Sequence, residues 1–196
     1  MAEVKRTYFE NGALKSECFE INGKKNGEFK SYYTNGQLSC ICPYIDDKQN
    51  GEYKRYHSNG QLYVSCSYID GKKNGEEKRT HYPSGQLWQI VFYIDDKKNG
   101  EYKSYHPNGQ LEAICSYIDN KKNGEYKEYY YNGQLAGICS YVDDKRNGEF
   151  KSYWRNGKLW YICSFIDDMK NGEYKKYYQN GQLESSCTYI DDKKVE

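Results

Sequence analysis

The chain has 196 residues, with 29 basic and 28 acidic side chains, a formal net charge of +1 and a mean hydropathy of -1.11. This near-neutral balance gives no electrostatic reason to expect nucleic acid or an anionic membrane as a strong partner. No apolar run approaches the ~18 residues of a transmembrane segment, and the N-terminal MAEVKRTYFE lacks the apolar region of a secretory signal. We therefore expect a soluble, cytoplasmic protein.

Tyrosine is the main source of apolar surface that the chain can bury. Leu, Ile, Val and Phe together make up about 16% of the residues, below the ~20% under which a highly charged chain is disordered. The small net charge and the 24 tyrosines argue against disorder. We expect tyrosine rings to supply most of the buried surface.

An internal repeat organises the sequence from end to end. A turn of the type YxNGQL recurs at intervals of 24 residues, with a single interval of 25. Asn-Gly supplies the positive φ that a tight hairpin turn needs. The turn glycines are Gly12, Gly36, Gly60, Gly85, Gly109, Gly133, Gly157 and Gly181.

A second recurring motif, of the type IDDKKNGEY, alternates with the first and is also interpreted as a turn. The segments between turns are 7 to 9 residues long and rich in Tyr, Ile and Cys, which is typical of strands joined by hairpins. No segment has the 3.6-residue apolar period of a capped helix. The glycines of this second set are Gly27, Gly51, Gly75, Gly100, Gly124, Gly148 and Gly172.

These features predict an all-β fold: an elongated, single-sheet antiparallel meander of about eight stacked β-hairpin repeats, a solenoid with a 24-residue period, in one domain over residues 1–196. About sixteen strands spaced ~4.8 Å apart give a sheet of roughly 75 Å. At its two ends, Lys5 with Arg6 and the segment 191–194 carry charges that discourage pairing with further strands.

The fourth copy departs from the pattern. It has one extra residue between Gly75 and Gly85, and Glu77 replaces the aromatic residue of the other copies. An added residue in one strand is what a β-bulge requires, so a local kink is predicted near Glu77 to Pro83.

The fifth copy, from Gly100 to Asp119, allows a prediction of register. With a two-residue Asn-Gly loop, Tyr102 lies opposite Cys115, Ser104 opposite Ala113 and His106 opposite Leu111. The opposite face then carries Glu101, Lys103, Tyr105, Glu112, Ile114, Ser116 and Ile118. The alternative is a three-residue loop with a bulge, favoured by Pro107, which shifts the register by one. We prefer the first register.

The eight cysteines are predicted to be structural thiols. Seven occupy the sixth position after a turn glycine, and Val91 takes that place in the fourth copy, which indicates a small apolar filler. Equivalent positions in neighbouring hairpins are about 9.6 Å apart, too far for a disulfide. Reduced thiols are typical of the cytosol. The seven are Cys18, Cys42, Cys66, Cys115, Cys139, Cys163 and Cys187; Cys40 is the eighth.

No catalytic, metal or cofactor site is predicted. His57 and His106 occupy a slot that holds Tyr or Trp in other copies, so each is interpreted as one ring in a row. The repeated Glu-x-Lys pairs are interpreted as solvated charge rows, and the Asp-Asp-Lys segments carry too many lysines for a calcium loop. The sequence therefore predicts a protein that is not an enzyme.

The runs YYxNGQL and NGEYKxY, joined by an apolar strand ending in Tyr-Ile and a Lys-rich turn, resemble the MORN repeat group, in particular the variant found in YwqK-type antitoxins. The similarity spans about Tyr8 to Asp191. It implies hairpins stacked into an extended, grooved sheet used for protein association, and in some members lipid head groups are proposed ligands.

The preferred function is a non-enzymatic scaffold that binds another protein, or a second copy of itself, through a sheet surface rich in Tyr and Lys. The alternatives are binding of a lipid head group or carbohydrate in aromatic clefts, and antitoxin-like neutralisation of a protein partner. Aromatic anchors beside cations are typical of interfaces. The candidate partner-binding residues are Tyr56, Trp88, Lys103, Tyr105, Lys127, Tyr129, Tyr153, Trp160 and Tyr177.

Overall fold

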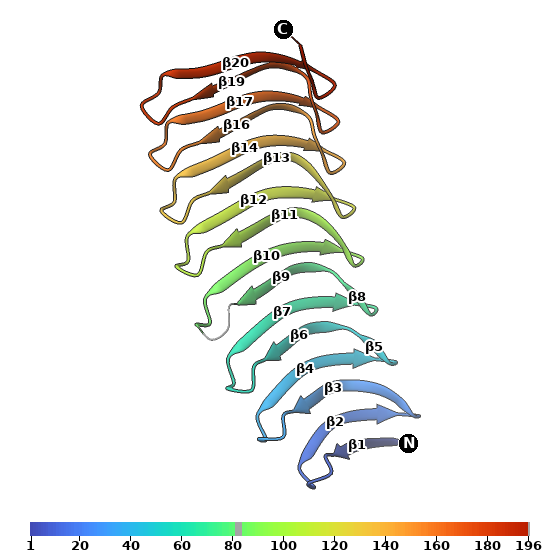
Figure 1. Cartoon of the computed structure of the whole chain (residues 1–196). Coiled ribbons are helices and arrows are strands. Elements are labelled where there is room, and N and C mark those ends of the chain that lie inside the picture. The colour runs from blue at the N-terminus through green and yellow to red at the C-terminus, as the bar shows by residue number, and fades with distance from the viewer. Residues whose placement is uncertain (81–83, 196) are drawn as a thin grey trace. The chain divides into compact units, whose positions relative to one another are not determined.

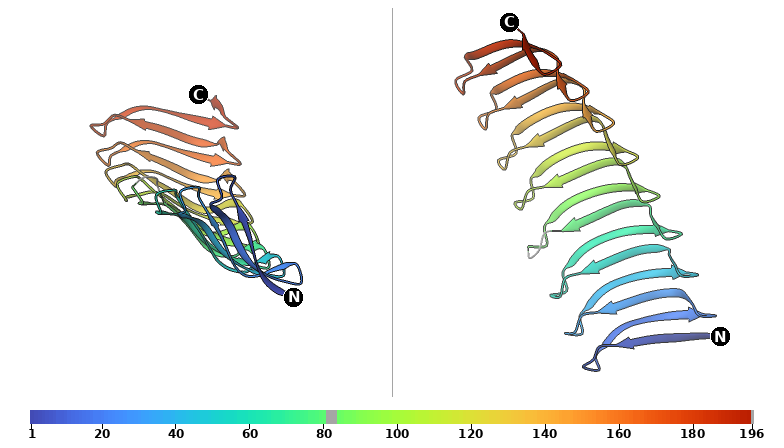
Figure 2. Two further views of the ribbon diagram at one scale, coloured as in Figure 1. Left: turned by 90° about the horizontal axis from the view of Figure 1, so that it is seen from below. Right: turned by 45° about the vertical axis from the view of Figure 1, so that its right-hand side comes forward.

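The computed structural model describes residues 1–80 and 84–195, and within them every regular element is a β-strand. The chain divides into two compact units, Met1–Lys97 and Lys98–Glu196. Within each unit, consecutive strands lie side by side and run antiparallel (Figures 1 and 2). The predicted all-β meander of hairpins is confirmed, and the two-residue strands are short extensions of the strands that follow them.

The first unit contains β1 (Ala2–Tyr8), β2 (Leu14–Ile21), β3 (Lys24–Tyr32), β4 (Leu38–Ile45), β5 (Lys48–Gln49), β6 (Gly51–Tyr56), β7 (Leu62–Ile69), β8 (Lys72–Lys73), β9 (Gly75–Thr80) and β10 (Leu87–Ile94). From its boundary onward, the second contains β11 (Lys97–Tyr105), β12 (Leu111–Ile118), β13 (Lys121–Tyr129), β14 (Leu135–Val142), β15 (Lys145–Arg146), β16 (Gly148–Tyr153), β17 (Leu159–Ile166), β18 (Met169–Lys170), β19 (Gly172–Tyr177), β20 (Leu183–Ile190) and β21 (Lys193–Val195).

The Asn-Gly hairpins combine the two registers that the sequence left open. His106 N–H donates to the Gln110 carbonyl and Gly109 N–H to that of His106, which defines a three-residue loop. Tyr105 then lies opposite Leu111, so the predicted pairing of His106 with Leu111 is wrong. A second bulge, at Glu112, cancels the shift. Tyr102 opposite Cys115 and Ser104 opposite Ala113 are therefore confirmed.

The two-residue loops lie at the other end of the hairpins. Asp143 and Asp144 have φ of 50° and 70°, the pair of positive values that a type I′ turn requires. Lys145 and Arg146 already pair with β14, and the Asn-Gly that follows breaks the strand before β16. The second set of glycines thus marks irregularities within strands, which corrects their interpretation as turn residues.

Successive turns of this kind are joined by hydrogen bonds. Lys122 N–H donates 2.8 Å to the Asp144 carboxylate, and Asp144 N–H donates 3.0 Å to the Lys122 carbonyl. The Asp143 N–H bonds the Asn123 side chain in the same way. These bonds satisfy the turn's polar groups and account for its acidic residues without a cation.

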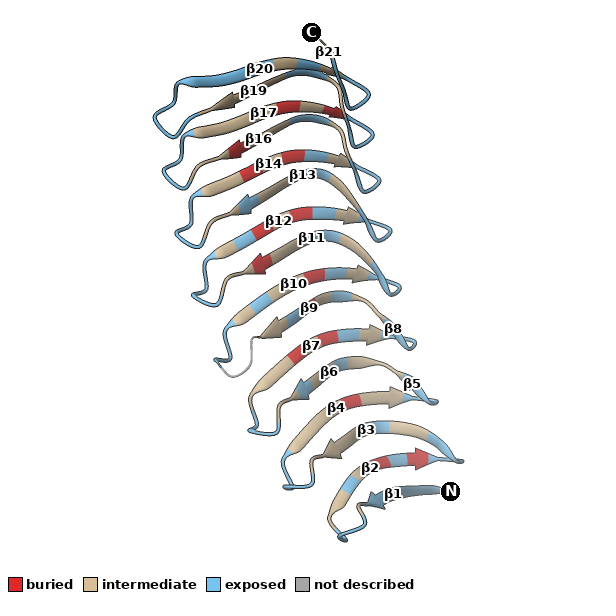
Figure 3. Cartoon of the chain, viewed as in Figure 1, coloured by how far each residue is buried: buried red, intermediate tan, exposed pale blue. Residues whose placement is uncertain are grey.

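The buried residues lie on one face, near the middle of the strands (Figure 3). We call this the thiol face; it carries the cysteine slot of each hairpin. Val91 is 2% exposed and Cys139 1%, so valine and cysteine fill the same buried position, as predicted. All eight cysteines are free thiols. The core of each unit is this single layer of thiols and the rings above it.

In the fourth hairpin, Glu77 lies in a regular ladder opposite Val91. The predicted kink therefore does not begin at Glu77. Residues 81–83, at the other end of that prediction, lie outside the described residues.

Candidate binding surfaces

The opposite face, which we call the Glu/Lys face, carries Glu, Lys and Tyr at alternate positions in most hairpins; the first has Val4 and Arg6 in place of Glu and Lys, and the fourth has Thr80 in place of Tyr. The Lys103 ammonium lies 2.5 Å from the Glu101 carboxylate on the same strand, and Lys127 pairs with Glu125. The carboxylate raises the pKa of Lys127, so the pair stays ionised. Equivalent pairs join Glu28 to Lys30, Glu52 to Lys54, Glu76 to Lys78, Glu149 to Lys151 and Glu173 to Lys175.

Seven of the nine candidate partner-binding residues lie on the Glu/Lys face. Lys127 and Tyr129 line a shallow hollow of about 290 Å³ together with Leu111 and Ile114. The tyrosines of this row are half-buried, and their backbones are held by the preceding hairpin: the Tyr130 hydroxyl donates to the Tyr153 carbonyl at 2.6 Å. The seven are Tyr56, Lys103, Tyr105, Lys127, Tyr129, Tyr153 and Tyr177.

An aliphatic row, missed in the sequence-based site, completes this face. The last residue before each two-residue turn lies on this face, as Ile118 does by strand alternation with Ile114 and Ser116. Ile69 and Ile118 are both 56% exposed. The row comprises Ile21, Ile45, Ile69 and Ile94 in the first unit, and Ile118, Val142, Ile166 and Ile190 in the second.

The two candidate tryptophans, Trp88 and Trp160, do not lie on the Glu/Lys face. Trp160 packs against Trp154 at 4.8 Å and Tyr161 at 5.1 Å between ring centroids, on the thiol face. Its indole N–H is buried, with no hydrogen-bond partner among the described residues. Trp88 occupies the equivalent bulge position of the fourth hairpin. A bulge places two consecutive side chains on one face, which is why simple alternation predicted the wrong side for Trp160, and for Glu112.

Most ring pairs on the thiol face are covered by a cation that lies just after the two-residue turn; the Tyr53–Tyr68 pair has Gln49 at that position. Tyr126 and Tyr141 meet edge to face at 5.8 Å, and the Lys122 ammonium lies 4.9 and 5.1 Å from their centroids. Arg146 lies 4.0 Å from Phe165 in the same way. These contacts shield the thin core from water. The 24-residue spacing of Lys and Tyr was the sequence signal for them.

The predicted row of rings beside the turns is confirmed. His106 Nε2 lies 2.9 Å from the Tyr129 carbonyl, and the Trp154 indole donates to the Tyr177 carbonyl at 3.1 Å. In the first unit, the Tyr33 hydroxyl donates to the Tyr56 carbonyl at 2.7 Å. The histidine thus takes the structural place of a tyrosine or tryptophan and joins one hairpin to the next.

The thiol face of the second unit contains a hollow of about 500 Å³, which we call the acidic hollow. It forms where Ser104, Ala113 and Ala136 are too small to fill the space between rings. Glu112 and Glu128 line it against the single cation Lys122. In the next hairpin Tyr161 occupies the corresponding space and stacks on Phe150 at 5.3 Å.

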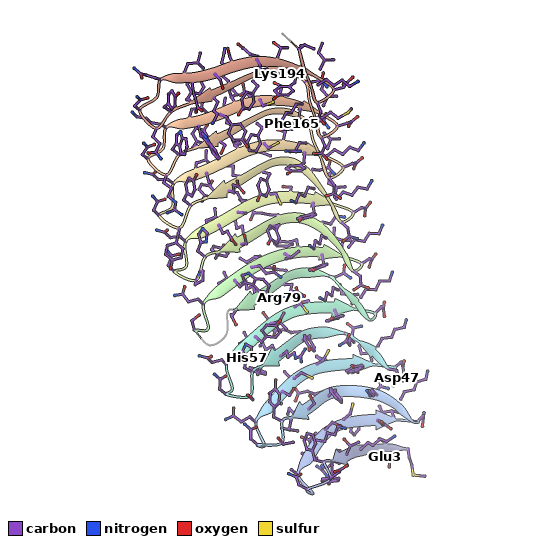
Figure 4. All side chains as sticks on the ribbon, in the orientation of Figure 1. Glu3, Asp47, His57, Arg79, Phe165 and Lys194 are labelled. Carbon is purple, nitrogen blue, oxygen red and sulfur yellow. The ribbon has the colours of Figure 1, made fainter. Side chains whose placement is uncertain are left out.

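A second hollow, of about 330 Å³, lies on the thiol face of the first unit; we call it the basic hollow. Arg55, Lys73 and Arg79 line it, with Glu77 as their counter-charge. The Glu77 carboxylate is 1% exposed and lies 2.5 Å from the Lys73 ammonium and 2.8 Å from Arg79 Nε. Figure 4 shows Arg79 on β9.

Burial raises the pKa of several thiols and phenols of this face. The pKa of Cys42 is raised to about 11, and that of Tyr117 to about 12, chiefly because desolvation disfavours the charged form. The thiols are therefore protonated at neutral pH and poor nucleophiles. Among the described residues, no group of three or more His, Cys, Asp or Glu is arranged to hold a metal ion.

The fold and its repeated surface define a class, the open antiparallel hairpin-repeat proteins. The family model described as MORN repeat variant matches residues 25–46, 49–70, 98–119, 122–143, 146–167 and 170–191. The chain therefore belongs to the MORN repeat variant family, and MORN repeats are generally modules that bind proteins or membranes. No helix of the described residues is long and apolar enough to span a membrane.

Comparison with solved structures finds only distant likeness. TarM of S. aureus matches at 10% identity and a TM-score of 0.33, covering 50% of this chain and 19% of TarM. The Tc holotoxin pore of Photorhabdus luminescens matches at 14% identity and a TM-score of 0.25, covering 96% of this chain and 12% of the other. The chain thus spans under a fifth of these two proteins. No curated protein matches.

Proposed function

We propose that the chain is a non-enzymatic scaffold that associates with a protein partner, or with a second copy of itself, through the Glu/Lys face. The supporting observation is periodicity. Every hairpin except the fourth, which has Thr80 at this position, presents a Tyr and an exposed aliphatic residue at the same place, such as Tyr105 with Ile118 and Tyr129 with Val142. Between them, Glu–Lys pairs cancel the charge.

This arrangement suits association with an extended protein surface. Tyrosine supplies contact area at low cost in side-chain entropy, and paired charges carry little net charge into an interface. A single hairpin contributes little affinity, but identical contacts in successive hairpins add within one binding event. Free, largely buried thiols favour the cytosol as the place where this happens.

The test is affinity capture from the native cell with matched variants. Tyr105→Ala, Tyr129→Ala and Tyr153→Ala, combined in one chain, remove anchors from the Glu/Lys face. Tyr131→Ala is the control, because Tyr131 is 58% exposed and its ring packs 5.3 Å from that of His106. We expect a specific protein with wild type and control, and its loss with the triple variant while circular dichroism shows that the variant remains folded. Equal recovery by all three contradicts the proposal.

A second candidate is capture of a small ligand in the acidic hollow. Its volume of about 500 Å³, its tyrosine walls and the buried Ser104 hydroxyl favour a sugar or a cationic head group. Liposome and sugar-array binding test it, and retention on neither surface removes it. Neutralisation of a toxin is also binding of a protein partner, so the affinity capture described above tests it as well.

A further inference from the structure

Two arginines of the first unit flank a single buried valine. Arg55 on β6 and Arg79 on β9 both lie opposite Val64 of β7, one on each side. All three side chains line the basic hollow. Their Cα atoms are therefore separated by two strand spacings, about 9.6 Å. Two like charges facing one hollow repel each other unless an anion lies between them.

The buried carboxylate of Glu77 does not fill that role. It lines the hollow but is 1% exposed, and it is already paired with Lys73 and with the Nε atom of Arg79. No hydrogen bond joins the Arg79 Nη atoms or the Arg55 guanidinium to another described residue. Glu77 thus holds Arg79 in place, while three cations against one carboxylate leave an excess of two positive charges.

The feature is local to this hairpin pair. At the position shared by Arg55 and Arg79, other hairpins carry Ser31, Ser104, Glu128, Ser152 or Lys176, and Lys176 is paired with Glu184 at 2.8 Å. At the position of Glu77 they carry an aromatic ring such as Tyr102 or Tyr126. The chain therefore departs from its own repeat at two neighbouring slots, and both changes act on the same 330 Å³ hollow.

We propose that the basic hollow is a binding site for a phosphate monoester dianion, held between the guanidinium groups of Arg55 and Arg79. A dianion neutralises the excess of two charges, and guanidinium groups match phosphate oxygens with paired hydrogen bonds. The tyrosine rings of the hollow, Tyr53 and Tyr63, leave an apolar wall for the group esterified to the phosphate. The site lies on the thiol face and does not depend on the function proposed for the Glu/Lys face.

The experiment is isothermal calorimetry on the full chain at low salt with three probes: inorganic phosphate, phenyl phosphate and benzoate. We expect saturable binding of both phosphates that weakens steeply with added salt. If phenyl phosphate binds more tightly than inorganic phosphate, the ligand of the basic hollow is an aromatic phosphate monoester. If the two bind equally, the ligand is free phosphate. We expect benzoate to bind at least about tenfold more weakly, because it carries one charge and not two.

The variant pair is Arg55→Gln and Arg155→Gln. Arg55 is exposed, forms no ion pair with another described residue and lies 6.0 Å from the Tyr63 ring. Arg155 is exposed and lies 5.7 Å from the Tyr130 ring in the other unit. Each variant removes one charge without unpairing a buried group. We expect Arg55→Gln to weaken phosphate binding at least about tenfold and Arg155→Gln to leave it within about twofold. Equal effects of the two variants, benzoate binding as tight as phenyl phosphate, or no binding overturns the proposal.

Discussion

The two hollows on the thiol face differ in charge although they are built on the same repeat. In the second unit the hollow is framed by Tyr126 and Glu128, and in the first unit by Glu77 and Arg79 at the equivalent slots. Two further positions differ, since Ser104 and Glu112 of the second unit correspond to Arg55 and Tyr63 of the first. Because strand pairing fixes which positions are neighbours, these four differences distinguish an acidic hollow from a basic one. The repeat therefore sets the backbone, while single slots set the chemistry of each hollow.

The largest effect is expected at the thiol layer that both units share. Cys139→Asp should lower the free energy of unfolding by about 3–5 kcal/mol, since a carboxylate at a 1% exposed position loses its hydration. Cys139→Val should change it by less than about 1 kcal/mol, because Val91 fills the same slot in the first unit. Urea unfolding measures both. Equal damage from the two variants would show that the thiol has a chemical role.

Placing the residues of the basic hollow at the equivalent positions of the acidic hollow tests the comparison directly. Tyr126→Glu should destabilise the second unit by about 2–4 kcal/mol, because the new carboxylate lies beside Glu128 without the arginine that serves Glu77. Adding Glu128→Arg should recover about half of that loss, measured as a coupling energy in a urea double-mutant cycle. Additive effects of the two substitutions would contradict the account.

The bonds between hairpins should be equivalent in the two units. Tyr33→Phe removes the hydroxyl that donates to the Tyr56 carbonyl, and Tyr130→Phe the one that donates to the Tyr153 carbonyl. Each loss should cost about 1 kcal/mol of unfolding free energy. Tyr8→Phe is the control, since Tyr8 is 58% exposed. A cost in one unit only would show that the hairpins are joined differently.

The smallest effect is a decline of stability in alkali, common to both units. The folded-state pKa values of Cys42 and Tyr117 are raised, from 9.0 to about 11 and from 10.0 to about 12. The stabilisation is complete below the unfolded-state pKa values and is lost as the pH rises through the folded-state values. We expect a slight fall of the urea midpoint by pH ~9.5 and a steeper one above pH ~10.5. A midpoint that is constant across this range would contradict the prediction.

The fold could be predicted from the sequence because the repeat supplies the same turn and strand signals many times. The turn geometry could not, because a bulge such as that at Glu112 depends on backbone curvature and leaves the pairing of Tyr102 unchanged. The equivalent bulge between β16 and β17 placed Trp160 on the unexpected face. The Arg55–Arg79 pair was within reach, since the two residues are separated by 24 positions, one repeat.

The most direct test of the central claim is photo-crosslinking at two neighbouring positions. A benzoylphenylalanine at Tyr129 lies on the Glu/Lys face, whereas one at Tyr131 lies beside His106 at the end of the thiol face. Irradiation in the native cell should crosslink Tyr129, and not Tyr131, to a discrete protein or to a second copy of the chain. A crosslink at Tyr131 with none at Tyr129 would contradict docking through the Glu/Lys face.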